Sequence, residues 1–347
     1  MEGSSDDLAR ILAGLALGVG AVNVALLIAW RRSLRRRIRR VAAQTTRGGV
    51  PIAVAQAPKA SGAGAADDLS EGAGNGIIWR RWMGKRLVLP QYYPPFARDQ
   101  EATRRDYSIA ASARFPGKHA EFRSQYGEDA FLFDLFEGKG DGVYVEAGAF
   151  DGQTLSVTSA LEEIGWNGLL VEPTPLLAKA CRDARPRSII VEAALTSPGG
   201  PAEIEFCQVT GFEHSGLYSF VYTEGEEPPP PPVPGASKEF IRVAASTLDR
   251  ILATHPIQID AFVLDVEGHE LPALAGLDLG KTRPKVIVVE VSAVKSVDEL
   301  TEYLQARGYV VAGVLGVSVV MVATECRELL KRATRLLAAA KPVHTGV

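Results

Sequence analysis

Short apolar runs alternate with amphipathic segments from residue 122 to about residue 340, and this alternation constrains the fold more than any other feature. The runs are rich in Val, Ile and Leu and are bounded by Gly or Pro, which is typical of buried strands. The expected buried strands are 142–148, 168–173, 188–195, 260–268 and 285–291. Strands that alternate with helices predict an α/β fold with a parallel central sheet and helices on both faces.

The segments that follow these strands have helical patterns. The expected helices are 154–165, 175–184, 248–253, 269–277 and 297–308, with a last amphipathic helix around 329–337. Ser246 and Asp249 resemble a capping box for the third of them. Residues 202–209 alternate apolar and polar side chains, as a half-exposed antiparallel strand does. Residues 309–324 predict a closing hairpin that is divided at its two glycines.

Residues 11–30 form an uncharged apolar run of 20 residues that is followed directly by an Arg-rich segment, 31–40. As a helix the run would be roughly 30 Å long, the thickness of a bilayer core. Trp30 stands at its end, where interfacial aromatic residues occur. We therefore expect one transmembrane helix within residues 1–40. A buried core helix and an organelle transit peptide are the alternatives.

The charges around this run predict its orientation. Seven Arg residues in 31–40 outnumber the single Arg10 before the run, so the domain that follows is expected on the cytosolic side of a membrane. The absence of Asn-x-Ser/Thr motifs and the three widely spaced cysteines agree with a reducing compartment. Gly14 and Gly18 form a Gly-x-x-x-Gly pair, a pattern through which two membrane helices can dimerise.

Composition divides the rest of the chain. Residues 41–76 are rich in Ala, Gly, Gln, Ser and Thr and are expected to form a flexible linker. Residues 77–121 are expected to form an irregular N-terminal extension of the domain, which spans 122–340. The proline run at 228–232 predicts a stiff surface insertion, with a partner-docking motif as the alternative.

Net charge argues against nucleic acid as the main partner. The chain has 38 basic and 41 acidic residues, but residues 1–40 alone carry a net charge of +5, so the remainder carries −8. Phosphate binding requires a basic face, which an acidic body does not supply. The cysteines also lack the spacing of metal ligands, and no metal site is expected from them.

The first expected strand ends in an acid-x-Gly-x-x-x-Gly pattern. Its residues are Glu146, Gly148, Asp151 and Gly152. Glycine lets the backbone approach a ligand closely. The pattern differs from the Gly-x-Gly-x-x-Gly of dinucleotide-binding folds, and an acid suits an ammonium and a sulfonium group better than a pyrophosphate. S-adenosylmethionine carries both groups. A tight structural turn is the alternative.

The next strand ends in another acid, Glu172, 20 residues after Gly152. A carboxylate at this position can accept hydrogen bonds from both hydroxyl groups of a ribose. Two acids in this order at the carboxyl ends of neighbouring strands predict a cofactor that contains a nucleoside.

Acids and an imidazole follow the 260–268 strand. Asp265 and Glu267 point to the same side in a strand, and His269 and Glu270 come directly after them. They could position an acceptor, act as a general base or bind a metal. A helix start with acids at its N-terminus is the purely structural alternative.

Together these residues resemble the FkbM-type methyltransferase family over about residues 122–325. The matching pieces are Ser124 to Asp129, Gly142 to Gly152, Gly165 to Gly168 with Val171 to Pro173, Ser246 to Asp249, and Asp265 to Glu270. The resemblance implies a Rossmann-like seven-stranded methyltransferase fold, S-adenosylmethionine as cofactor, and methyl transfer that is usually to oxygen. Residues 212–220 and 224–235 depart from the family pattern and are expected to cover the acceptor.

The resemblance also implies roles for individual residues. Those that would bind the cofactor are Glu146, Gly148, Asp151, Gly152, Glu172 at the ribose, Ala193 or Ala194 near the adenine, and Gln125 and Glu128 on the N-terminal side. The expected acceptor is a small molecule, a glycan or a lipid.

The base that deprotonates the acceptor is our own inference. His269 is the first candidate because imidazole titrates near neutral pH, and Asp265 and Glu267 are the alternatives. Asp265 with Glu290 could instead hold Mg²⁺. Two other functions stay open: a nicotinamide oxidoreductase, and a catalytically silent methyltransferase fold that serves as a membrane-tethered interaction module.

Overall fold

The computed structural model describes residues 79–82, 85–88, 91–92, 100–225, 228, 234–291, 294–338 and 341–342. These residues belong to two compact units. The smaller unit contains the described residues of 209–215 and 222–239, and the main unit contains the others. Within the smaller unit the Ser215 hydroxyl accepts from the Gly211 amide (3.2 Å) and donates to the Phe212 carbonyl (2.9 Å), which closes a turn.

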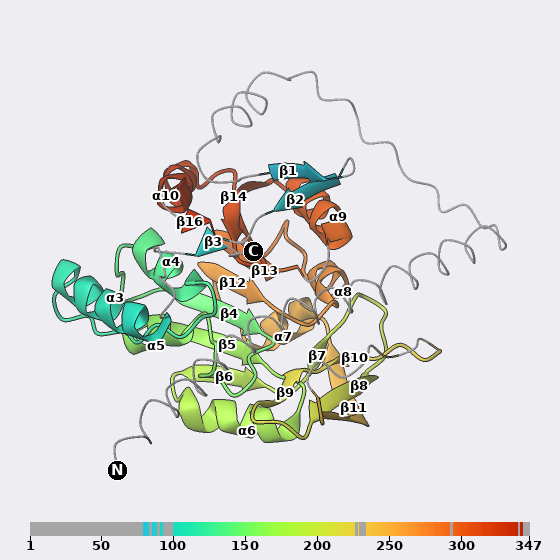
Figure 1. Cartoon of the computed structure of the whole chain (residues 1–347). Coiled ribbons are helices and arrows are strands. Elements are labelled where there is room, and N and C mark those ends of the chain that lie inside the picture. Colours follow the sequence, from blue (N-terminus) through green and yellow to red (C-terminus); the bar gives the residue numbers. More distant parts are fainter. Residues whose placement is uncertain are drawn as a thin grey trace, which may run out of the picture. The chain divides into compact units, whose positions relative to one another are not determined.

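A seven-stranded sheet is the centre of the main unit (Figure 1). Its strands, in spatial order, are β14 (Tyr309–Leu315), β15 (Ser318–Ala323), β13 (Val286–Glu290), β12 (Ala261–Leu264), β4 (Val143–Ala147), β5 (Asn167–Val171) and β6 (Ser188–Val191). The strands from β13 to β6 are parallel, and β15 is antiparallel to both its neighbours. The expected α/β fold with a parallel central sheet is confirmed.

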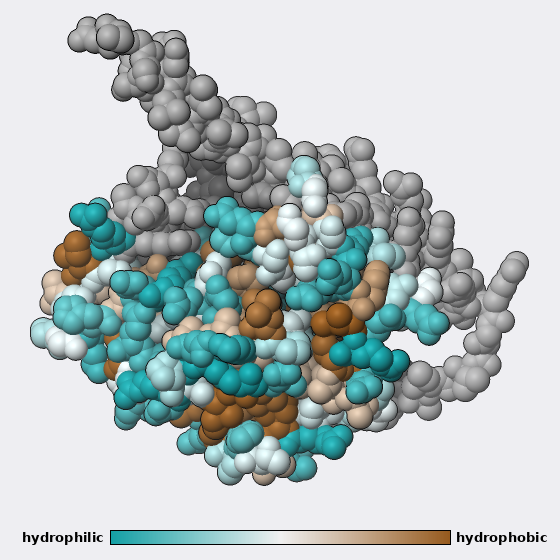
Figure 2. Space-filling model, turned by 90° about the horizontal axis from the view of Figure 1, so that it is seen from below, coloured by the Kyte–Doolittle hydropathy of each residue, from teal (hydrophilic) through white to brown (hydrophobic). Residues whose placement is uncertain are grey.

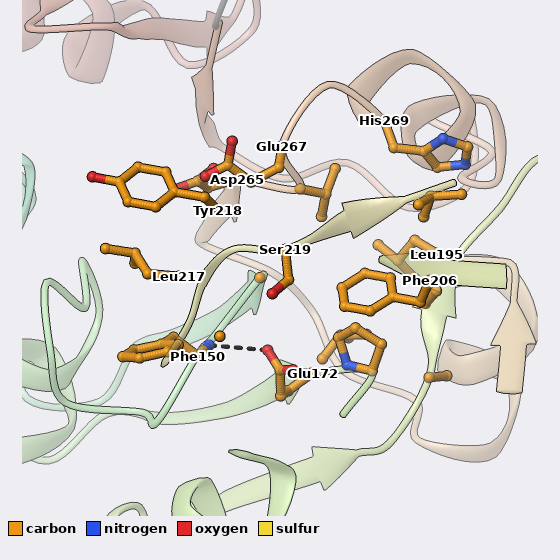
Figure 3. A pocket seen from close by; sticks show the side chains of 18 residues that line it. Phe150, Glu172, Leu195, Phe206, Leu217, Tyr218, Ser219, Asp265, Glu267 and His269 are labelled. Atoms are coloured by element: carbon orange, nitrogen blue, oxygen red, sulfur yellow. Dashed lines mark hydrogen bonds between the residues drawn. The ribbon is translucent and has the colours of Figure 1, made fainter. Parts of the chain in front are cut away.

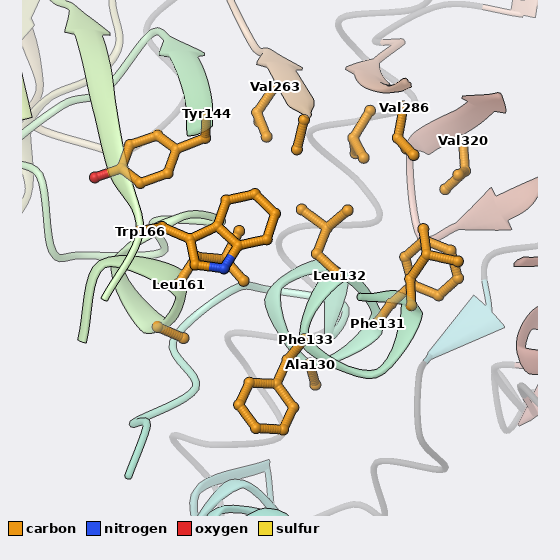
Figure 4. Close-up of a cluster of buried hydrophobic side chains, with 14 of the residues drawn as sticks. Ala130, Phe131, Leu132, Phe133, Tyr144, Leu161, Trp166, Val263, Val286 and Val320 are labelled. Atoms are coloured by element: carbon orange, nitrogen blue, oxygen red, sulfur yellow. The ribbon is translucent and has the colours of Figure 1, made fainter. Parts of the chain in front are cut away.

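Helices cover both faces of this sheet, as expected. One face packs against α4 (Glu128–Leu135), α5 (Ser159–Glu163) and α10 (Arg327–Ala338). The other packs against α7 (Leu248–Thr254), α8 (Glu270–Ala275) and α9 (Val294–Gln305). Successive strand residues point to opposite faces, so Tyr144 and Val263 join the first core whereas Val145 and Phe262 join the second. Figure 4 shows the first core, where Trp166 lies near Tyr144 and the side chains of α4.

The expected third strand, 188–195, is divided between two sheets. β6 ends at Val191, and Ala194–Leu195 form β7, which pairs in parallel with β11 (Ser237–Ser246). β7 and β11 belong to a four-stranded sheet with β8 (Glu203–Thr210) and β10 (Phe220–Val221), in the order β10-β8-β11-β7. The chain changes sheets at 192–193, which places Ala193 at the carboxyl end of the large sheet.

The expected helix 154–165 is also shorter than its pattern suggested. α5 begins only at Ser159, because the residues before it bind the Glu146 carboxylate through the Val157 amide and the hydroxyls of Ser156 and Thr158. These bonds hold the segment in a loop.

Further expectations are corrected at the caps and ends. α7 is capped by Thr247, whose hydroxyl accepts from the Arg250 amide at 3.2 Å, and the capping box predicted at Ser246 does not form. Of the two glycines predicted to divide the closing hairpin, Gly313 lies inside β14, and only Gly316 lies in the turn.

The segment before residue 122 is more regular than expected. β1 (Trp79–Trp82) and β2 (Lys85–Val88) form an antiparallel pair, and β3 (Gln91–Tyr92) pairs with β16 (Lys341–Pro342). α3 (Gln100–Arg114) follows, and its Ala111 is buried in the first core. α6 (Pro175–Ala184), between β5 and β6, has the predicted bounds.

The surface seen in Figure 2 is mainly hydrophilic, with hydrophobic side chains in separate patches. Among the described residues, no helix combines the length and apolarity needed to cross a bilayer. The expected transmembrane helix at 11–30, the Gly14 and Gly18 pair, the 41–76 linker and most of the 228–232 proline run lie outside the described residues. These expectations stay predictions.

Candidate functional site

Two pockets that share lining residues open at the carboxyl ends of β4, β5 and β12. The first pocket (Figure 3) is lined by Gly148, Phe150, Val171, Glu172, Pro173, Ala193, Ala194, Leu195, Phe206, Gly216, Leu217, Tyr218, Ser219, Val221, Asp265, Val266, Glu267 and His269. The second pocket is lined by Gln125, Glu128, Glu146, Ala147, Gly148, Ala149, Phe150, Thr154, Leu155, Ser156, Val157, Leu217, Val263, Leu264, Asp265, Val288, Glu290 and Ser318. Both include Gly148, Phe150, Leu217 and Asp265. We call these four residues the shared wall.

Gly148 occupies a position that only glycine can fill. Its φ is 82°, and a Cβ built on it would lie 1.6 Å from the backbone oxygen of Asp265. Its amide donates to the Val171 carbonyl at 3.0 Å. The ends of β4, β5 and β12 therefore meet here, as the predicted pattern required.

Glu172 lies in the first pocket, at the end of β5. Its Oε2 accepts from the Phe150 amide at 3.1 Å, and its Oε1 accepts from the amide and hydroxyl of Thr174 at 3.0 and 2.7 Å (Figure 3 shows the bond to Phe150). Burial raises the pKa of this carboxyl to about 7, although these bonds oppose the shift. The side chain is thus held in one orientation at the pocket wall.

Glu146 lies in the second pocket, but its carboxylate is occupied by protein groups. It accepts from Ser156 Oγ (2.9 Å), the Val157 amide (2.9 Å) and Thr158 Oγ1 (2.5 Å), and Arg185 Nη1 is 3.6 Å away. The arrangement gives Glu146 a role in shaping the loop after β4, which the sequence did not suggest.

Asp151 and Gly152, also predicted to bind the cofactor, line neither pocket. The Asp151 carboxylate accepts from the amides of Gln153 (2.8 Å) and Thr154 (2.6 Å) and closes a local turn. Gly152 has a φ of 79°, and a Cβ there would meet Arg185 Cγ at 3.0 Å. Both residues therefore shape the loop after β4 without lining either of the two pockets.

Gln125 and Glu128 line the second pocket, as predicted. Glu128, at the start of α4, accepts from the Tyr126 amide (2.9 Å) and from Ser318 Oγ (3.0 Å). Burial raises the pKa of the Glu128 carboxyl to about 7. These bonds connect the segment before α4 to β15 across the pocket.

Asp265, Glu267 and Glu290 form a group of carboxyls beside the shared wall. Asp265 hydrogen-bonds Glu290, whereas its Oδ1 is buried with no hydrogen-bond partner in the described part of the chain. Burial raises the pKa of all three carboxyls, and the repulsion between them raises those of Glu267 and Glu290 further. Two carboxyls that hydrogen-bond each other must share a proton, so this pair can both hold and accept one.

His269 lies apart from that group. Figure 3 shows it at the opposite end of the first pocket from Tyr218, beyond Leu195. Burial lowers the pKa of its imidazole and so favours the neutral ring, and its buried Nε2 has no hydrogen-bond partner among the described residues. Of the three predicted base candidates, the structure therefore keeps Asp265 and Glu267 together and separates His269 from them.

Sequence reasoning missed several residues that shape the pockets. Five non-glycine residues in the described ranges have a positive φ, and four of them line the pockets: Phe150 (53°), Leu155 (58°), Tyr218 (65°) and Glu267 (52°). Such conformations are costly and concentrate at functional sites. Nothing in these residue types indicates that their backbones would adopt them.

The described residues contain no group of three or more His, Cys, Asp or Glu side chains arranged to hold a metal ion.

The family model described as Methyltransferase FkbM domain matches residues 146–311. Among solved structures, the Methyltransferase FkbM from Methylobacillus flagellatus KT is 13% identical, covers 53% of this chain and 44% of its own, and has a TM-score of 0.36. An O-methyltransferase from Bacillus cereus in complex with SAH is 13% identical, with coverages of 63% and 89% and a TM-score of 0.32. A precorrin-6y C5,15-methyltransferase from Geobacter metallireducens GS-15 is 14% identical, with coverages of 58% and 89% and a TM-score of 0.33. These structural similarities are too low to assign roles. No curated protein matches the chain.

Proposed function

We propose, because the FkbM methyltransferase domain model matches residues 146–311, that the protein transfers a methyl group to an oxygen atom of its acceptor. S-adenosylmethionine is the methyl donor. Its sulfonium supplies an electron-poor methyl carbon that a nucleophilic oxygen can attack. The acceptor that we propose is a hydroxyl or carboxyl group of a small molecule, a glycan or a lipid.

The orientation of the Glu172 carboxylate carries the cofactor part of this proposal. A carboxylate offers about four positions for hydrogen-bond donors. Phe150 and Thr174 fill three of them, two on Oε1 and one on Oε2. One position on Oε2 is left for a ribose hydroxyl, whereas the sequence had suggested two. The residues of the first pocket therefore fit the nucleoside half of the cofactor.

The remaining assignments follow the pocket walls. We propose that Ala193, just after β6, lies beside the adenine, and that Gly148 serves the cofactor by letting the ends of β4 and β12 meet at the shared wall. Gln125 and Glu128 line the second pocket, which would hold the amino-acid end of the cofactor. Glu146, Asp151 and Gly152 support this pocket through the loop after β4.

Asp265 is the residue that we propose as the base. It belongs to the shared wall, where the two pockets meet, and its buried Oδ1 has no partner that competes for a proton. Its raised pKa makes the carboxylate a better proton acceptor than an exposed one. Glu267 is the alternative. The position of His269 supports a contact with the nucleoside side of the pocket instead.

We also propose that residues 11–30 anchor the protein in a membrane, with the methyltransferase domain on the cytosolic side. The support is the length of the apolar run and the Arg residues after it. The 41–76 segment would let the domain reach acceptors at or near the membrane surface.

The experiment that tests the activity is transfer of an isotopically labelled methyl group. The full-length protein would be incubated with labelled S-adenosylmethionine and with lipid and metabolite extracts of a deletion strain. We expect label in an extract component together with release of S-adenosylhomocysteine. Cofactor binding without either product in any extract would favour the catalytically silent interaction module.

A further inference from the structure

Arg185 is a buried arginine directly after α6 that lines neither of the two pockets. Its guanidinium makes five hydrogen bonds, equal to the number of its N–H groups. The acceptors are Glu162 Oε2 (2.9 Å), the Gly152 carbonyl (2.9 Å), Ser156 Oγ (3.1 Å), Tyr144 Oη (2.7 Å) and Thr158 Oγ1 (2.8 Å). Only 3% of the side chain is exposed.

The five acceptors belong to two different parts of the main unit. Tyr144 is in β4 and Glu162 is in α5, and both side chains are buried. The other three acceptors belong to 152–158, the loop between β4 and α5. Arg185 therefore attaches this loop to the rigid sheet and helix beside it.

The same loop forms one side of the second pocket. Thr154, Leu155, Ser156 and Val157 all line that pocket. Arg185 binds Gly152 and Thr158, which flank this stretch, and the Ser156 hydroxyl within it. Because Arg185 itself lines neither pocket, any effect it has on a ligand must act through the loop.

The loop needs such support because its backbone is strained and irregular. Leu155, at its centre, has a φ of 58°. Strained conformations persist only where the surrounding contacts determine them. Here two charged side chains do so together, because Glu146 accepts from the Ser156 and Thr158 hydroxyls that also bind Arg185.

Gly152 and Cys181 also fix the position of the loop relative to α6 and the arginine. A Cβ on Gly152 would meet Arg185 Cγ at 3.0 Å and Cys181 Cα at 3.2 Å, so glycine is needed for the loop to approach α6. The Cys181 thiol donates to the Phe150 carbonyl at 3.1 Å and fixes the start of the same loop.

We propose that Arg185 is a positioning residue of the methyltransferase site, which fixes the 152–158 loop and thereby the shape of the second pocket. The identity of the ligand in that pocket rests on the proposed function. The attachment of the loop does not, so it can be tested without ligand.

The test uses three variants of the full-length protein and one control. Arg185→Met removes all five bonds, and Thr158→Val removes one of them together with the bond from the same hydroxyl to Glu146, without altering a pocket-lining side chain. Amide hydrogen exchange of 150–158 is measured without ligand, and affinity for S-adenosylhomocysteine is measured by calorimetry. We expect faster exchange in both variants and, for Arg185→Met, a loss of affinity of about tenfold or more, since a misplaced pocket wall weakens every contact it makes. Arg185→Lys, which keeps the charge but not the planar guanidinium, should recover only part of the affinity that Arg185→Met loses.

Arg283→Met is the matched control. Arg283 bonds Glu325 at 3.0 and 2.9 Å and packs over the Tyr309 ring at the opposite end of the sheet. This variant should lower the melting temperature without changing exchange at 150–158 or affinity. If Arg185→Met does not fold, Arg185→Lys decides, because it changes Arg185 alone, and its exchange at 150–158 should also be faster than in the wild type. Wild-type exchange at 150–158 in folded variants would overturn the proposal, whereas faster exchange in a protein that never binds S-adenosylhomocysteine would overturn the proposed function alone.

Discussion

The backbone oxygen of Asp265 lies where the side chain of any residue other than glycine at position 148 would begin: a Cβ on Gly148 would be 1.6 Å away. The two residues directly follow β4 and β12, which are adjacent and parallel. This contact sets how closely the two strand ends approach, and both residues form part of the shared wall. The glycine is thus required by the protein backbone itself, before any ligand is considered.

Gly148→Ala should therefore lower the free energy of unfolding by more than the strain of a left-handed backbone alone would. Gly199 is the matched control, because its φ of 78° is similar and nothing lies within 4 Å of a Cβ there. We expect Gly199→Ala to lower the free energy of unfolding by about 1 kcal/mol, and Gly148→Ala to lower it by about 3 kcal/mol or more. Denaturant unfolding measures both. Equal losses would show that the contact with Asp265 relaxes at no cost.

The pH dependence of cofactor binding should follow Glu172. Its pKa of about 7 means that the carboxylate becomes protonated as the pH falls from 8 to 6. A proton would occupy the free position on Oε2, so affinity for S-adenosylhomocysteine should fall with pH, by roughly tenfold over this range for a single group. Glu172→Gln should bind more weakly at pH 8 and show a flatter profile. Calorimetry at three pH values measures this, and an unchanged slope in the variant would rule Glu172 out as its cause.

Asp265→Asn should reduce turnover and leave cofactor affinity within a few-fold of wild type. Loss of a general base typically lowers the rate by about 10²–10⁴-fold. His269→Ala serves as the comparison, and we expect it to change affinity for S-adenosylhomocysteine more than turnover. Release of labelled product from an active extract measures the rate. The reverse pattern in the two variants would restore His269 as the base, as the sequence first suggested.

The membrane proposal predicts a defined protease pattern. Protease added to sealed vesicles should digest the methyltransferase domain only when the cytosolic face is outside, because the Arg residues of 31–40 stay on that face. The protein should also stay with the membrane after carbonate extraction. Protection of the domain in vesicles with the cytosolic face outside would reverse the topology, and full extraction would remove the anchor.

The sequence predicted the sheet and its strand ends well because both depend on local patterns. Apolar runs closed by Gly or Pro identified β4, β5, β12 and β13, and parallel strands that end at one edge bring Glu172 and Asp265 to the same cavity. Glu172 and Asp265 could be selected as candidate site residues from their positions at the ends of predicted strands alone.

The errors arose where distant side chains act on a local pattern. Glu146 and Arg185 hold the residues before α5 in a loop, although their apolar spacing is helical. The division of the third strand at 192–193 depends on pairing with β11, some 50 residues away. His269 lies only two residues after Glu267, but the turn between them sends its side chain to the other end of the pocket.

The measurement that most directly tests the account is calorimetric titration of the full-length protein with S-adenosylhomocysteine, alongside Glu172→Ala and Glu192→Ala. Glu192 lies on the same edge of the sheet, but its side chain lines neither of the two pockets. Its carboxylate pairs with Arg182 at 3.0 Å. We predict one site per chain, a loss of about tenfold or more in affinity for Glu172→Ala, and no change for Glu192→Ala. Absence of binding to the folded wild-type protein, or equal affinity in all three proteins, would contradict the assignment of this cavity to S-adenosylmethionine.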